Sequence, residues 1–178
     1  MRSIWVFLLV LYCQHSLANQ LTEQQLNAWF TASKQLQPII EKIEQDNTFQ
    51  DISNPSQFAE EMASQLKHSK MNAEVSNILA SNNLTIDTWA KTTEQVVFAA
   101  MAASADGNEA QIQQYKTMKQ QLLDNPDLTK QQKQEMMSMF EVSDLWINQL
   151  EAVPQSDIDL VKPMLDKFNQ ELGWEMEN

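Results

Sequence analysis

Residues 84–102 read LTIDTWAKTTEQVVFAAMA and form the segment of the chain, beyond the N-terminus, that is richest in apolar side chains. The apolar residues recur every three or four positions, which is the period of an amphipathic helix. Thr85 can cap the start of this helix, and Leu84 and Trp89 can pack on each other across its first turn. We therefore predict a helix here and expect it to lie at the centre of the fold.

The same start signal recurs along the chain. A capping side chain is followed by a polar partner at the third helical position at Thr22 with Gln25, Asn54 with Gln57, Thr129 with Gln132, and Ser156 with Asp159. The helices between these starts are predicted to end at residues 82–83, 106–108, 124–126 and 153–154. Two points stay open: the first helix either ends near Pro38 or kinks there, and residues 67–70 either separate two helices or bend one.

The composition favours helices throughout. The chain has 178 residues with only 2 Gly and 5 Pro, and its commonest residues include the helix formers Gln, Glu, Ala, Leu and Met. Long strand-like alternations of Val, Ile and Thr are missing. The sequence therefore predicts an all-α protein, a compact bundle of six or seven amphipathic helices.

The N-terminus resembles a secretory signal. Arg2 is followed by an apolar run that is too short to span a bilayer, and residues 16–18 (Ser-Leu-Ala) are typical of a signal peptidase site. We predict a signal peptide over residues 1–18, cleavage near Ala18, a single helical domain over residues 19–178, and a periplasmic or secreted location in a bacterium. Cleavage would remove the only cysteine, Cys13, so disulfides cannot stabilise the mature chain. A lipid anchor on Cys13 is disfavoured by the bulky Tyr12 before it.

The charge limits the partners. With 12 Lys and Arg against 24 Asp and Glu, the net charge is −12. This field repels phosphate backbones and anionic membranes, so we expect no nucleic-acid partner. No second apolar run of transmembrane length follows the signal, so we expect no stable membrane insertion after cleavage.

The sequence predicts no catalytic residue, no cofactor and no metal site. His68 would be the only histidine left after cleavage, and it lies in the basic run Lys67-His68-Ser69-Lys70, which is typical of a helix end. Acidic pairs such as Glu60-Glu61 are numerous, but a chain this acidic places many of them on solvated helix faces. We therefore expect a protein that is not an enzyme.

Methionines cluster in residues 136–139, which read MMSM. Thioethers can bind Cu(I), yet methionine is also an ordinary filler of helical cores and of partner grooves, and we favour packing over copper. The residues that we predict to line an apolar groove between helices are Met136, Met137, Met139, Phe140 and Trp146.

Two resemblances can be named. Residues 21–25 (LTEQQ) and 128–132 (LTKQQ) match the LTxxQ pattern of the Spy and CpxP family of periplasmic chaperones. That resemblance implies a small all-α protein that holds unfolding clients on a concave surface without nucleotide. Residues 77–102 also resemble short exported helical proteins of proteobacteria whose function is unknown, which implies the same fold class and compartment.

These observations favour non-enzymatic binding. We expect a periplasmic accessory or chaperone-like protein that binds a peptide or protein partner through the apolar groove. The alternative is a carrier that holds a lipid or another small apolar ligand in a cavity of the helical bundle. An open groove at the methionines would favour the protein partner, and a closed pocket would favour the ligand.

Overall fold

The computed structural model describes residues 20–45, 52, 54–104 and 109–174, and every regular element in them is helical. The α-helices are α2 (Glu23–Gln45), α3 (Phe58–His68), α4 (Asn72–Ser81), α5 (Ile86–Ser104), α6 (Glu109–Asp124), α7 (Lys130–Ser138), α8 (Glu141–Glu151), α9 (Gln155–Val161) and α10 (Leu165–Leu172). Two short 3₁₀ helices, η1 (Pro55–Gln57) and η3 (Lys162–Met164), lead into α3 and α10. The prediction of an all-α fold is confirmed. The predicted signal peptide and the predicted helix end at residues 106–108 lie outside the described residues.

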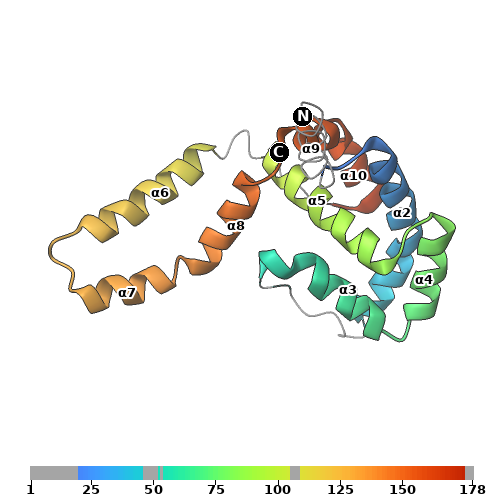
Figure 1. Cartoon of the computed structure of the whole chain (residues 1–178), viewed down its shortest axis with the longest axis horizontal. Coiled ribbons are helices and arrows are strands. Elements are labelled where there is room, and N and C mark those ends of the chain that lie inside the picture. The colour runs from blue at the N-terminus through green and yellow to red at the C-terminus, as the bar shows by residue number, and fades with distance from the viewer. Residues whose placement is uncertain (1–19, 46–51, 53, 105–108, 175–178) are drawn as a thin grey trace, which may run out of the picture.

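The centre of the bundle is α5 (Figure 1). It is buried at 10 of its 19 positions and contacts α2, α3, α4 and α9. Helices α2, α3, α4, α9 and α10 each add buried side chains to the same core, among them Leu36, Leu66, Leu79, Val161 and Phe168. The prediction that residues 84–102 form the central helix is therefore confirmed, and the burial of their apolar face explains why.

Three of the predicted helix starts have the expected capping bonds. The backbone N–H of Gln25 donates to Oγ1 of Thr22 at 3.2 Å, and Thr129 and Gln132 form a full capping box at the start of α7. The backbone N–H of Thr88 likewise donates to Oγ1 of Thr85 at 3.1 Å. Local hydrogen bonds of this kind need no tertiary partner, so they follow from the sequence.

The start predicted at Ser156 is wrong. Helix α9 begins at Gln155 with Pro154 as its N-cap, and the backbone N–H of Asp157 donates to the carbonyl oxygen of Pro154 at 3.0 Å. The ring of Pro154 holds its φ at −62° and the residue is extended, which is the geometry of a cap. The hydroxyl of Ser156 is left to donate to Oδ1 of Asp157 at 3.2 Å.

Both open points are settled. Helix α2 continues through Pro38, which faces solvent while Ile39 and Ile43 beyond it are buried. Burial of these two side chains offsets the backbone hydrogen bond that a proline removes. Residues 67–70 separate two helices, because α3 ends at His68 and Ser69 is extended.

Helices α6, α7 and α8 form an arm that projects from one side of the bundle (Figure 1). Of the residues from 109 to 151 whose burial is described, none is buried. The arm is attached through α8, which contacts α5 and η1, and the rings of Trp146 and Phe98 lie 5.5 Å apart at this junction. Within the described part of the chain, no helix has the length and apolarity that crossing a bilayer requires.

Candidate functional site

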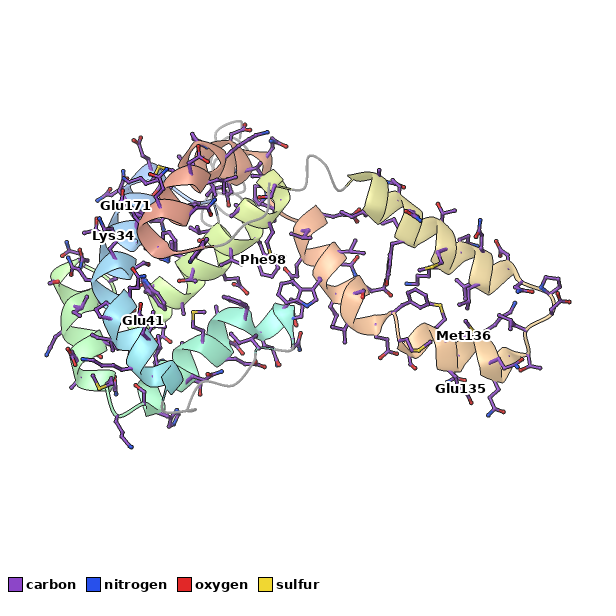
Figure 2. All side chains as sticks on the ribbon, turned by 180° about the vertical axis from the view of Figure 1, so that it is seen from behind. Lys34, Glu41, Phe98, Glu135, Met136 and Glu171 are labelled. Carbon is purple, nitrogen blue, oxygen red and sulfur yellow. The ribbon has the colours of Figure 1, made fainter. Side chains whose placement is uncertain are left out.

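The five predicted groove residues all lie on the arm, but they have different neighbours. Met136 and Met137 are half-buried, and Met136 lies on the side of α7 that faces α6 (Figure 2). The ring of Phe140 packs edge-on against Tyr115 of α6 at 5.4 Å, whereas Trp146 packs on the bundle. Met139 is exposed.

A polar network holds α6 against α8. The hydroxyl of Tyr115 donates to Oδ1 of Asp144 at 3.0 Å and also lies 3.1 Å from the carbonyl oxygen of Phe140. Lys119 of α6 forms an ion pair with the same Asp144 carboxylate. Partial burial and the bond to Asp144 raise the pKa of Tyr115. These bonds fix the two sides of the arm, which has no fully buried core of its own.

The arm carries an exposed apolar stripe, which we define as Met139, Val142 and Leu145. Their exposed fractions are 69%, 55% and 40%. The spacing of three residues places them on neighbouring turns at the end of α7 and the start of α8. Glu135 and Glu141 beside the stripe are exposed. Contiguous exposed apolar side chains rimmed by charge are typical of a binding surface.

A second candidate site is a cavity inside the bundle, which we call the aromatic cavity. Its volume is about 520 Å³, and it is partly open to solvent. Four aromatic rings contribute to its wall, from Trp29, Phe58, Trp89 and Trp174. The remaining lining residues are Ser33, Gln37, Ile40, Glu41, Met62, Thr93, Val97, Leu172 and Gly173.

Two buried indoles of this cavity are locked by hydrogen bonds. Nε1 of Trp29 donates to Oγ1 of Thr93 at 2.8 Å, and Nε1 of Trp89 donates to Oγ of Ser33 at 3.0 Å. Each bond joins α2 to α5 across the core. The tryptophan rings are therefore fixed in orientation, as a preformed binding site requires.

The third indole of the cavity belongs to Trp174, the last of the described residues. Helix α10 ends at Leu172 and is capped by Gly173, whose φ of +67° lies in the left-handed region that favours glycine. This turn sends the chain back over the bundle and places the ring of Trp174 at 5.7 Å from Trp29 and 5.4 Å from Phe168. This cavity was not predicted from the sequence, although the turn residue Gly173 followed by an aromatic residue was a usable signal.

His68 and Glu94 are titratable groups that lie outside both candidate sites. Nδ1 of His68 lies 2.7 Å from the carbonyl oxygen of Ser64 in the last turn of α3, the helix-end position that the sequence predicts. Burial raises the pKa of Glu94, although a backbone hydrogen bond from Ala59 opposes that rise. Among the described residues, no three His, Cys, Asp or Glu side chains gather as metal ligands.

Comparison with known proteins identifies no relative. No protein-family model, curated protein or solved structure matches this chain. The resemblance to the Spy and CpxP family therefore stays a prediction. Both of its LTxxQ segments are accounted for by the capping bonds at Thr22 and Thr129.

Proposed function

We propose that this is a non-enzymatic binding protein of the bacterial periplasm, with an accessory or chaperone-like role, and that its apolar stripe binds an amphipathic helix of a partner protein. The observation that carries this proposal is the exposure of Met139, Val142 and Leu145. The periplasmic location rests on the predicted signal peptide. Of the methionine cluster, only Met139 thus belongs to the stripe, as one end of it.

The geometry of α8 supports a helical partner. Val142, Leu145, Trp146 and Gln149 follow the spacing i, i+3, i+4, i+7 and so share one face of α8. Trp146 packs on Phe98 of the bundle, whereas Val142 and Leu145 on the same face are exposed to solvent. A helix laid along this face would continue packing that already exists at the junction of arm and bundle.

The charges define the partner further. Glu135 and Glu141 are exposed beside the stripe, and the chain carries a net charge of −12. A partner helix with lysine or arginine on both sides of its apolar face would be attracted, and an acidic helix would be repelled. We therefore propose a basic amphipathic helix as the binding partner.

A defined peptide tests this proposal. A leucine–lysine peptide of about 18 residues should bind the protein in calorimetry, and a leucine–glutamate peptide of the same pattern should not. The triple variant Met139→Gln, Val142→Thr, Leu145→Gln should lose most of the binding. The matched control is Met118→Gln with Leu123→Gln, which changes two exposed apolar residues of α6 outside the stripe.

Two outcomes would overturn the proposal. One is equal binding of the lysine peptide by the triple variant and the control. The other is a concentration-dependent dimer in sedimentation that the triple variant abolishes, because the stripe would then be an interface between two copies of this chain.

A further inference from the structure

We propose that the aromatic cavity binds an organic cation with an apolar body, held by the half-buried rings of Phe58 and Trp174 and by the carboxylate of Glu41. This inference does not depend on the apolar stripe, because the cavity lies in the bundle and the stripe lies on the arm. It restricts the small ligands of the cavity to organic cations with an apolar body.

The size and the wall of the cavity fit a small molecule. About 520 Å³ lies within the usual range for ligand pockets, which is roughly 300 to 1,000 Å³. Besides the four rings, the wall has aliphatic and thioether groups from Ile40, Met62, Val97 and Leu172. Such a wall can bury the apolar part of a ligand.

Several hydrogen-bond donors of the wall are already engaged. The buried indole N–H groups of Trp29 and Trp89 are already engaged by Thr93 and Ser33. The hydroxyl of Thr93 also donates to the carbonyl oxygen of Trp89 at 2.9 Å, so its hydrogen is engaged as well. An anionic ligand would also be repelled by the carboxylate of Glu41, which disfavours carboxylates and phosphates in this cavity.

The charge of the cavity favours a cation. Among the described residues that line the cavity, only Glu41 is charged. Figure 2 shows Glu41 on α2. Aromatic rings carry negative charge on their faces and attract cations within about 6 Å. Because Glu41 is exposed, a ligand cation can approach its carboxylate from solvent. The rings and the carboxylate thus both attract a cation.

Three probes of matched shape test the sign of the charge. They are benzyltrimethylammonium, its neutral isostere with carbon in place of nitrogen, and the anion phenylmethanesulfonate. Binding to the purified protein is followed by tryptophan fluorescence and by calorimetry. The cation should bind at least about threefold more tightly than the neutral isostere, as expected for a cation over aromatic rings, and the anion should not bind.

Two variants test the residues. Glu41→Gln keeps the shape of an exposed side chain and should weaken binding of the cation about two- to fivefold, with the difference shrinking at high salt. The control Glu74→Gln makes the same change at an exposed position of α4 outside the cavity and should leave binding unchanged. Trp174→Leu should weaken binding of the cation more than binding of the neutral isostere. A general loss of packing would weaken the binding of both probes to the same extent.

Several results would overturn the inference. Equal affinity for the cation and its neutral isostere would make the cavity a general apolar pocket, and tighter binding of the anion would reverse the assigned charge. If none of the three probes binds, the cavity is not the binding site that we propose. None of these results would affect the proposal for the apolar stripe, whose peptide test uses other residues.

Discussion

The indole Nε1 of Trp29 and the hydroxyl Oγ1 of Thr93 form a 2.8 Å hydrogen bond that joins α2 to α5 inside the core. Trp29 is only 1% exposed, so its N–H group has no access to water. A buried donor without a partner costs about 1 to 3 kcal/mol, which makes this threonine a structural requirement of the cavity wall.

Thr93→Val should lower the free energy of unfolding by about 1 to 3 kcal/mol, because valine keeps the volume of threonine and leaves the Trp29 N–H unpaired. The control is Thr92→Val, which removes only a bond to the carbonyl oxygen of Thr88 in the same helix. Urea denaturation followed by circular dichroism measures both. Equal losses in the two variants would show that the cross-helix bond contributes little.

Gly173→Ala should destabilise the protein by about 1 to 2 kcal/mol, because alanine in the left-handed region meets a steric cost. Gly173→Asn should cost less, since asparagine tolerates this conformation. The fluorescence of Trp174 should shift to longer wavelength in the alanine variant if the ring leaves Trp29. Unchanged fluorescence and stability in the alanine variant would contradict the role assigned to this turn.

The burial of Asp157 predicts that the stability of the folded state depends on pH. It is 2% exposed, and burial raises its pKa above the ordinary value of 3.8, although the bonds from Leu21 and Ser156 oppose the rise. Because the folded pKa is higher than the unfolded one, the folded state binds the proton more readily, and the penalty for the buried charge disappears as the pH falls through the raised pKa.

The wild-type protein should therefore gain stability relative to Asp157→Asn as the pH is lowered from about 7 to about 4, since asparagine mimics the protonated form and keeps an acceptor for the Leu21 N–H. Asp157→Ala removes that acceptor and should cost about 1 to 2 kcal/mol. Unfolding curves across this range measure both effects. A stability difference between wild type and Asp157→Asn that does not change with pH would contradict the prediction.

Tyr115→Phe should loosen the arm without unfolding the bundle, because it removes the bond to Asp144 that ties α6 to α8. We expect amide hydrogen exchange in α6 to speed up by about fivefold, equivalent to about 1 kcal/mol, while α5 is unaffected. Thr117→Val is the matched control, since its hydroxyl bonds only within α6. Faster exchange throughout the chain would instead indicate a loss of global stability.

Much of the fold could be predicted because its signals are local. Thr22, Thr85 and Thr129 cap their helices through bonds to residues three positions away, and the period of the apolar residues in α5 identifies its buried face. Where two local signals compete, the prediction is weaker. At the start of α9, Pro154 takes the cap position that the sequence pattern assigned to Ser156.

The candidate sites were less predictable. The methionine cluster was visible in the sequence, but periodicity alone cannot distinguish the half-buried Met136 from the exposed Met139. The aromatic cavity gave no local signal beyond the turn at Gly173, because its tryptophans come from α2, from α5 and from the turn after α10. Only the packing of these elements brings the three rings together.

The sequence by itself therefore determined the helical class, several helix boundaries and the central place of α5, because hydrogen bonds within a few residues and the helical period decide them. The tertiary structure alone decided that α6, α7 and α8 stand away from the bundle and that a cavity remains between α2, α3 and α5. Those features depend on how helices dock, and docking is set by side chains that are distant in the sequence and meet only after folding.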